Sequence, residues 1–382
     1  MAKGVYVGIG DKAKKVKAMY VGVDGVAKKV KKAYIGVGGV ARLFFSFGVP
    51  KKYGNVTSLT ETGYSAAGAS VGNYALIAGG RPNGVSVNAI ATVNTYNSSL
   101  TKGTATDLSS AKYESTGAIV DGYALIAGGY DANLNTTKTV DAYDASLTKK
   151  SATALGVALR SAKFARVGGY AVITSGTASN NSSNKNTYAY NSSLTMTTAT
   201  ALPSVLYGTS ATSVGDYALF TGEQQTVYTY NSSLTQGETA TKLSVKRRDS
   251  GATSVGGCAM FAGGWYDNGD NDVHHKTVDT YNASLTKGTA TDLSLTRSRA
   301  IGVKLGDYAL IVGSLRGTSS TTVTGVVDMY DASLTMTTLT ALSTPRREMA
   351  SAVVGDYAIF AGGRTSASSS AVVATAEAYV LA

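Results

Sequence analysis

The chain has 382 residues, 43% of them hydrophobic, which is enough to fill the core of one large domain or two ordinary ones. Its 44 glycines, 24 tyrosines and single tryptophan favour many short strands joined by tight turns and argue against a helical protein. The only cysteine, Cys258, excludes an intrachain disulfide, and no apolar run is long enough for a membrane helix.

The positive charge lies almost entirely at the start of the chain. Residues 1–52 hold eleven Lys and one Arg against two Asp, which gives +10 of the net +11. The opening MAKGVYVGIG lacks the apolar length and the cleavage site of a signal peptide, so we expect synthesis in a cytoplasm. Any partner selected by charge should therefore contact this N-terminal segment.

Residues 3–44 repeat every fourteen residues, as KGVYVGIGDKAKKV, KAMYVGVDGVAKKV and KKAYIGVGGVARLF. Turn pairs separate short Val-rich strands in each copy, which predicts three β-hairpins. The pairs are Gly10-Asp11, Asp24-Gly25 and Gly38-Gly39. Hairpins this small are marginal alone, so we predict that residues 1–49 form a module that docks on a partner. The expected docking residues are Tyr6, Tyr20, Tyr34, Lys28, Lys29, Lys31 and Lys32.

These short basic repeats resemble those near the ends of structural and tail-associated proteins of bacteriophages that infect Gram-positive bacteria. The resemblance implies a virion protein, assembled in the host cytoplasm, present in multiple copies and bound to other virion proteins through residues 1–49. Clustered lysines are also typical of nucleic-acid binding. We favour the docking module, because alternation along a strand turns many of these lysines into solvent.

A block of the form Gly-x-Tyr-Ala-apolar-apolar then occurs seven times, with Cys258 in place of its tyrosine in the fifth copy. The tyrosine positions step by 49, 47, 47, 41, 50 and 49 residues, the period of a four-stranded propeller blade. A second block, Tyr-Asn/Asp-x-Ser-Leu-Thr, follows within each unit except the last. We predict strands A to D in each unit, with a tight Gly-Asp type turn between A and B.

The two ends of the repeat region complement each other. GNVTSL, residues 54–59, aligns without a gap on the D-strand sequence GTATDL of residues 103–108, whereas the last unit stops after strand C at AEAYVLA. We therefore predict that the strand around 54–59 pairs with strand C around Tyr379 and completes the last blade. The fold class is all-β, a seven-bladed propeller over residues 50–382.

Residues 53–382 resemble kelch repeats, through a glycine pair that ends strand B, Tyr-Asn/Asp in strand C, and a Leu with Arg nearby before the next strand A. The usual kelch Trp after strand C is replaced by SLT, which makes the unit a divergent, kelch-like one. Some kelch propellers are copper oxidases with a Tyr-Cys cofactor and histidine ligands. We expect no such activity, because Cys258 occupies a strand B tyrosine position and no second, distant histidine exists.

The differences in unit length fall in the B–C links, and variable loops on a rigid scaffold are typical binding sites. The fifth B–C link, WYDNGDNDVHHK at 265–276, holds the only Trp and both His. The candidate ligand-contacting residues are Trp265, Tyr266, Asp267, Asp270, Asp272, His274, His275 and Tyr130, together with Arg248, Arg299 and Arg347 from the D–A links.

Oxygen ligands at Asn268, Asp270, Asp272 and Asp279 are spaced like those of a calcium loop. Val273, however, stands where such a loop needs glycine, so we predict no metal site and no cofactor. The arginines of the D–A links, near Asp249 and Glu348, could instead form a rim for anions or sugars. They are Arg160, Arg247, Arg248, Arg297, Arg299, Arg346 and Arg347, of which we expect Arg247, Arg297 and Arg346 to bridge blades through backbone carbonyls.

No nucleophile, base and orienting group occur together in the sequence, so we expect no enzymatic activity. The favoured interpretation is a virion protein whose propeller recognises a glycan or protein on the host surface, without inserting into a membrane. Two alternatives remain open, a capsid or tail decoration protein without a host ligand and an enzyme that acts on surface polysaccharide.

Overall fold

The computed structural model describes residues 48–382 except 83–87, 179–181, 240, 270–271, 317–321 and 367–370, and six strand backbones before residue 47. These six strands pair in three antiparallel hairpins, as predicted. They are β1 (Tyr6–Ile9) with β2 (Lys12–Lys15), β3 (Met19–Val23) with β4 (Val26–Val30), and β5 (Lys32–Val37) with β6 (Val40–Ser46). The three predicted turn pairs and Lys31 lie outside the described residues.

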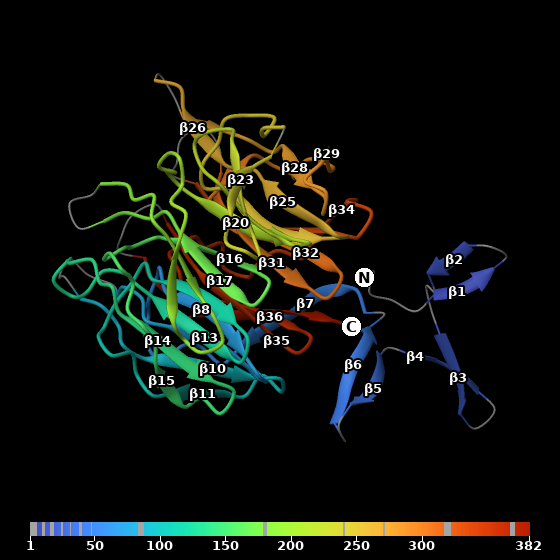
Figure 1. Ribbon diagram of the computed structural model, residues 1–382. Coiled ribbons are helices and arrows are strands. Elements are labelled where there is room, and N and C mark those ends of the chain that lie inside the picture. Colours follow the sequence, from blue (N-terminus) through green and yellow to red (C-terminus); the bar gives the residue numbers. More distant parts are fainter. Residues whose placement is uncertain are drawn as a thin grey trace.

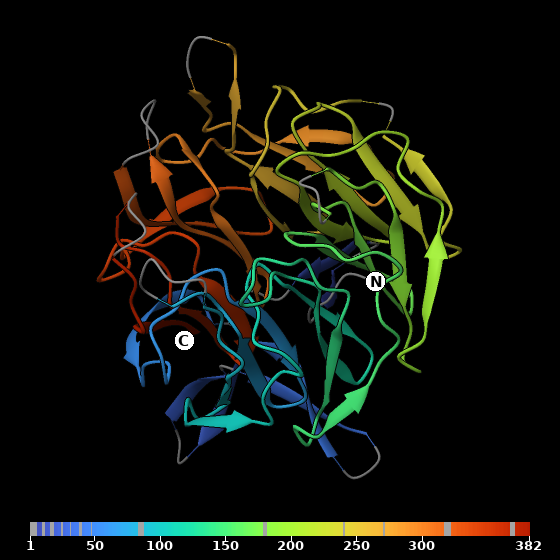
Figure 2. The ribbon, with the colours of Figure 1, turned by 90° about the vertical axis from the view of Figure 1, so that its left-hand side faces the viewer.

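The remaining strands form seven antiparallel blades arranged in a ring (Figures 1 and 2). Strands A to D of blade 1 are β8 (Ala67–Val71), β9 (Tyr74–Ala78), β10 (Val93–Asn97) and β11 (Lys102–Ala105). Those of blade 2 are β12 (Thr116–Val120), β13 (Tyr123–Ala127), β14 (Val140–Asp144) and β15 (Lys149–Ser151). Those of blade 3 are β16 (Lys163–Val167), β17 (Tyr170–Thr174), β18 (Thr187–Tyr190) and β19 (Met196–Ala199). The described part of the chain contains no helix, so the predicted all-β seven-bladed propeller is confirmed.

Blades 4 to 7 repeat this order, and two of them carry additions. Their strands are β20 (Ser210–Val214), β21 (Tyr217–Thr221), β22 (Val227–Asn231) and β23 (Gln236–Glu238); β24 (Gly251–Val255), β25 (Cys258–Ala262), β28 (Val278–Tyr281) and β29 (Lys287–Thr289); β31 (Ile301–Leu305), β32 (Tyr308–Arg316), β33 (Thr322–Tyr330) and β34 (Met336–Leu339); and β35 (Ala350–Val354), β36 (Tyr357–Ala361), β37 (Ala376–Leu381) and β7. Blade 5 adds the hairpin β26 (Trp265–Asp267) and β27 (Asp272–His274), and β30 (Arg297–Ser298) pairs with β32.

The ring closes between the two ends of the repeat region, as predicted. Strand β7 (Pro50–Val56) pairs with β37, with Tyr379 opposite Lys52, and supplies the D strand of blade 7. The predicted strand around 54–59 is therefore displaced, because the ladder begins four residues earlier, at Pro50, and ends at Val56. Closure leaves the last blade without an open strand edge.

Each strand has the burial that its place in the blade requires. Strand A alternates between buried and half-buried residues, as in Ala67–Val71, because it lines the central channel. Strands B and C are buried along nearly their whole length, between neighbouring blades, as in Tyr74–Ala78 and Val93–Asn97. The D strands are largely exposed at the outer edge. The core of the described residues consists of seven hydrophobic clusters, each lying between two adjacent blades.

The strand C tyrosine ties each blade to its neighbour. Each is fully buried, and its hydroxyl donates a hydrogen bond to a threonine carbonyl after the D strand of the preceding blade. The seven are Tyr96, Tyr143, Tyr190, Tyr230, Tyr281, Tyr330 and Tyr379, and they donate to the carbonyls of Thr57, Thr106, Thr153, Thr200, Thr241, Thr291 and Thr340.

The inner strands approach so closely that some positions accept only glycine. A Cβ added to Gly117 would lie 2.0 Å from the carbonyl oxygen of Gly68, and one added to Gly302 would lie 2.2 Å from that of Ala252. Both contacts join A strands of neighbouring blades, so the width of the central channel depends on these glycines.

Candidate functional site

The links between strands divide the propeller into two faces. The A–B and C–D turns lie on one face, which we call the turn face, and the B–C and D–A links lie on the other, the loop face. Figure 2 looks onto the loop face, and the N-terminal hairpins lie beyond the opposite side in Figure 1. All the candidate ligand-contacting residues come from links of the loop face.

A ring of seven residues surrounds the mouth of the central channel on the loop face. Each stands nine residues before the strand B tyrosine or Cys258, and each has φ between 52° and 56°, in the left-handed region. The members of this mouth ring are Ser65, Glu114, Ser161, Gly208, Asp249, Arg299 and Glu348. Only one is glycine, so the conformation carries strain that the surrounding structure has to offset.

Backbone hydrogen bonds that run from blade to blade offset this strain. The amide of Ser65 donates to the carbonyl of Glu348 at 2.9 Å, and the amide of Glu114 donates to that of Ser65 at 2.9 Å. Three more steps continue the circle, from Ser161 to Glu114, from Asp249 to Gly208, and from Arg299 to Asp249, at 2.7–2.8 Å. The left-handed turn aims each amide at the preceding blade and holds the ring side chains at the channel mouth.

The carboxylates of the mouth ring are each paired with arginine. Glu114 accepts hydrogen bonds from Arg160 Nη1 and Ser161 Oγ, both at 2.7 Å. Asp249 accepts one from Trp265 Nε1 at 3.0 Å and a longer one from Arg299 Nε at 3.4 Å. These contacts link the mouth ring to the loops around it, and the carboxylates are held in fixed positions.

Glu348 has the most cationic surroundings of the mouth ring. Its carboxylate contacts Arg347 Nη1 at 2.8 Å and Arg364 Nη2 at 2.5–2.7 Å, and Arg299 lies 4.0 Å away. Burial lowers the pKa of Arg347, as do the neighbouring arginines, whereas Glu348 raises it. Three guanidinium groups around one carboxylate leave an excess of positive charge on this side of the mouth.

The mouth ring encloses a cavity of about 280 Å³, lined by six of its members and the residues that follow them. Behind it, the central channel has a volume of about 790 Å³ and is lined by the A strands of all seven blades. Most channel residues are small, and its cationic side chains are Lys163, Arg166 and Lys304. The arrangement can bind polar ligands at the mouth through both hydrogen-bond donors and acceptors.

Around the mouth, arginine side chains lie over aromatic rings. Arg248 lies over Trp265 at 3.9 Å from the ring centre, and Arg160 lies over Tyr130 at 4.7 Å. Sequence reasoning missed two further pairs, Arg364 over Tyr64 at 4.3 Å and Arg81 over Tyr113 at 5.3 Å. Tyr64 and Tyr113 stand ten residues before the strand B tyrosine, so alignment of the repeats would have found them beside Arg160 and Arg248.

The fifth B–C link forms the hairpin β26–β27, which projects from the edge of the propeller (Figure 1). Trp265 stacks on His274, with ring centres 6.2 Å apart, and Tyr266 stacks on His275 at 5.7 Å. Because Trp265 and Tyr266 are adjacent in one strand, the two histidines lie on opposite sides of the hairpin. Burial lowers the pKa of both histidines, so they are neutral at neutral pH.

The described acidic residues of this region lie in two places, the β26–β27 hairpin and strand C of blade 5. Asp267 accepts a hydrogen bond from the amide of Gly269, while Asp279 lies inside blade 5, bound to Arg247. Asp272 begins β27 opposite Asp267, and Asp270 lies outside the described residues. No group of three or more His, Cys, Asp or Glu able to hold a metal ion is found in the described part of the chain.

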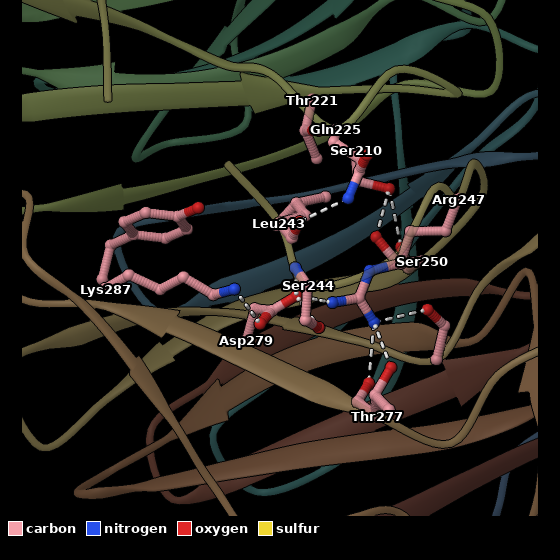
Figure 3. A network of polar contacts seen from close by, with 12 residues as sticks. Ser210, Thr221, Gln225, Leu243, Ser244, Arg247, Ser250, Thr277, Asp279 and Lys287 are labelled. Carbon is pink, nitrogen blue, oxygen red and sulfur yellow. Dashed lines mark hydrogen bonds and ion pairs between the residues drawn. The ribbon is translucent and has the colours of Figure 1, made fainter. Parts of the chain in front are cut away.

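The paired arginines of the D–A links separate into two kinds. Arg248, Arg299 and Arg347 lie around the mouth, as described, whereas the arginines before them, Arg247, Arg297 and Arg346, are completely buried. Arg247 donates to the carbonyls of Gly263 and Thr277 and pairs with Asp279 (Figure 3). As expected, these arginines bond to backbone carbonyls, although the carbonyls lie in strand C or in the link between strands B and C of one blade and not in two blades.

The buried cation occurs only in blades where strand C supplies an acid. The pairs are Lys112 with Asp141, Arg247 with Asp279, Arg297 with Asp328, and Arg346 with Glu377. In the other three blades the same positions hold Gly63 with Asn94, Leu159 with Tyr188, and Leu206 with Tyr228. These residues stabilise the blades and do not reach the mouth.

The docking residues predicted in the N-terminal module remain predictions. Tyr6, Tyr20, Tyr34, Lys28, Lys29 and Lys32 lie in the hairpin strands, and Lys31 lies outside the described residues. A search of the described residues for a helix that could span a membrane finds none.

No protein-family model matches the chain, and no curated protein matches it. Solved structures with a similar fold include a structure of YjhT, with 14% identity, a TM-score of 0.57, and 75% of this chain and 99% of that chain covered. A fungal alcohol oxidase of the AA5 family, in complex with copper, has 15% identity and a TM-score of 0.64, with 85% of this chain and 75% of that chain covered. At these identities the likeness shows the seven-bladed fold alone.

One expectation from the sequence is corrected by this comparison. We expected no enzymatic activity, but a solved structure of similar fold is an alcohol oxidase, so the architecture is compatible with catalysis. The sequence argument failed because it looked for one compact catalytic motif, whereas a propeller gathers residues from seven distant links at its channel mouth.

Proposed function

We propose that this protein is a structural component of a bacteriophage virion, which docks through residues 1–49 and presents a kelch-like propeller to a glycan or protein of the host surface. One observation carries the proposal. Strand β7 begins at Pro50 opposite Leu381, and the amides and carbonyls of Val49 and Ala382 bond to each other at the turn face. The module therefore leaves the propeller on the side opposite the mouth ring.

The chemistry of the loop face supports recognition of a polar ligand. Carboxylates and guanidinium groups alternate around the mouth, and the Arg299 side chain is 40% exposed. Aromatic rings surround them. Many copies on one particle would convert weak contacts of single propellers into firm attachment.

The test compares two variants of the full-length protein, one at each end. In the first, Lys28, Lys29 and Lys32 are replaced by serine, and in the second, Glu114→Gln is combined with Arg299→Ala. Binding is measured to purified particles lacking this protein and to isolated host cell walls. We expect the first variant to lose only particle binding and the second to lose only wall binding.

Either of two results would count against host recognition. If the wild-type protein does not bind walls, the propeller has no host ligand there. If the mouth variant loses particle binding instead, the propeller covers a neighbour in the particle, and the protein is a decoration protein.

A further inference from the structure

The rim of the loop face has one position that differs from its equivalents. The residue just before each mouth-ring residue is aromatic in three blades, as Tyr64, Tyr113 and Tyr207. Tyr64 and Tyr113 are buried, with 7% and 3% of their surface exposed, and an arginine lies over each ring. Tyr207 is 51% exposed, and within the described residues no guanidinium or second ring packs on it.

The exposure of Tyr207 follows from the shape of blade 4. The step between strand B positions is 41 residues here and 47 to 50 elsewhere, because Tyr230 follows Tyr217 by 13 residues, whereas the equivalent positions of the other blades are 20 to 23 residues apart. The neighbouring member of the mouth ring is Gly208, the only one without a side chain. Blade 4 therefore contributes no side chain to the mouth ring, and the exposed Tyr207 stands next to this position.

Close packing at Gly208 excludes a larger residue there. A Cβ on Gly208 would lie 2.7 Å from Cβ of Arg248 and 2.9 Å from Oδ1 of Asp249, at a φ of +54°. The next residue, Thr209, lines the mouth cavity, so Tyr207 stands two residues from the cavity wall.

Polar groups lie beside the exposed ring. The amide of Glu223 donates to the carbonyl of Tyr207 at 3.0 Å, and the Glu223 carboxylate pairs with Arg248 at 3.3 Å. About a quarter of each of these two side chains is exposed. An exposed tyrosine ring offers a flat apolar surface at low entropic cost, and a carboxylate with a guanidinium group beside it can bind hydroxyl groups.

We infer that Tyr207 and the mouth cavity form a saccharide subsite, in which a pyranose ring stacks on Tyr207 and the end of the glycan enters the cavity beside Thr209. The cavity volume of about 280 Å³ is near the lower end of the range for small-ligand sites, which suits a terminal sugar. The C–H face of a pyranose matches the tyrosine ring, and its hydroxyl groups match Glu223 and Arg248. This inference rests on the proposed function, of which it names the ligand class.

The experiment uses the full-length protein and a panel of methyl pyranosides, both neutral and N-acetylated, as probes. Binding is followed by saturation-transfer NMR and by titration, for wild type and for Tyr207→Ala and Tyr207→Phe. The control is Tyr53→Ala, since Tyr53 is 54% exposed but lies on β7, outside the rim. We expect Tyr207→Ala to weaken binding about tenfold, whereas Tyr207→Phe and Tyr53→Ala keep it.

The subsite and the proposed function fail in different ways. If no pyranoside binds, or if Tyr207→Ala binds like wild type, the subsite is refuted, even if the protein still attaches to host walls. If pyranosides bind through Tyr207 but wild type does not attach to host walls, the subsite stands and host recognition is refuted.

Discussion

Replacement of Arg247 by leucine should destabilise the propeller strongly. The guanidinium group is completely buried, and its loss leaves the carboxylate of Asp279, also fully buried, without its main counter-charge. Lys287, 3.1 Å from Asp279, and Ser244 would still contact the carboxylate. Removal of one partner of a buried ion pair costs about 3–5 kcal/mol, so we expect a decrease of this size in the free energy of unfolding.

The chain itself supplies the control, since blade 4 has Leu206 and Tyr228 at these two positions. The double variant Arg247→Leu with Asp279→Tyr should recover most of the lost stability, because no fully buried charge is then left unpaired; only the partly exposed Lys287 loses its partner. Thermal unfolding followed by circular dichroism should show the single variant melting roughly 5–10 °C below wild type. A single variant as stable as wild type, or a double variant less stable than the single one, would refute the reasoning.

Three other predictions concern stability. Gly117→Ala should lower the free energy of unfolding by about 3 kcal/mol, because the added Cβ would lie 2.0 Å from a carbonyl oxygen of the neighbouring A strand. The control Gly169→Ala should be tolerated, since no atom lies within 4 Å of the added Cβ. Equal denaturant midpoints for the two variants would contradict this reasoning. Tyr143→Phe should lower the free energy of unfolding by about 1 kcal/mol, because the hydrogen bond to the preceding blade is lost. An unchanged denaturant midpoint would show that this hydrogen bond does not stabilise the propeller. Burial opposes ionisation of Asp141, but Lys112 and hydrogen bonds lower its pKa to about 2. The ionised Asp141 therefore adds about 2 kcal/mol to the free energy of unfolding above about pH 4, and this stabilisation is lost as the pH falls through 2. When unfolding is measured against decreasing pH, the variant Asp141→Asn should not show this loss of stability.

The repeats predicted the blades and their closure, because the regular steps between the strand B tyrosines report one structural unit and residues 54–59 align on a D strand. Lys52 lies opposite Tyr379 as Lys102 lies opposite Tyr96, where the other D strands begin. The exact start of β7 was not predictable, since Pro50 and Lys51 extend the pairing with β37 beyond this position. The separation of Arg247 from Arg248 was anticipated, because the first arginine of each pair was expected to bond to backbone carbonyls.

The mouth ring was harder to predict. Its members share a left-handed backbone but differ in side chain, and Glu114, Arg299 and Glu348 are not residue types that signal a positive φ. The conformation arises from hydrogen bonds between blades, which are contacts between residues almost fifty positions apart. Likewise, the exposure of Tyr207 depends on the length of a neighbouring link and on Gly208, and not on the local sequence.

The closing strand also determines how the molecule would respond to mechanical load. A pull on the N-terminal module acts on β7 along the strand axis, because the module joins at Pro50, where the strand begins beside the chain end. The hydrogen bonds of an antiparallel pair lie perpendicular to the strands, so such a pull loads them in shear and all at once, instead of opening them singly. With seven residues, β7 is longer than the D strand of any other blade, which has three or four. The strand pair that would carry a force applied through the N-terminal module, β7 with β37, is thus the longest of the seven pairs between strands C and D.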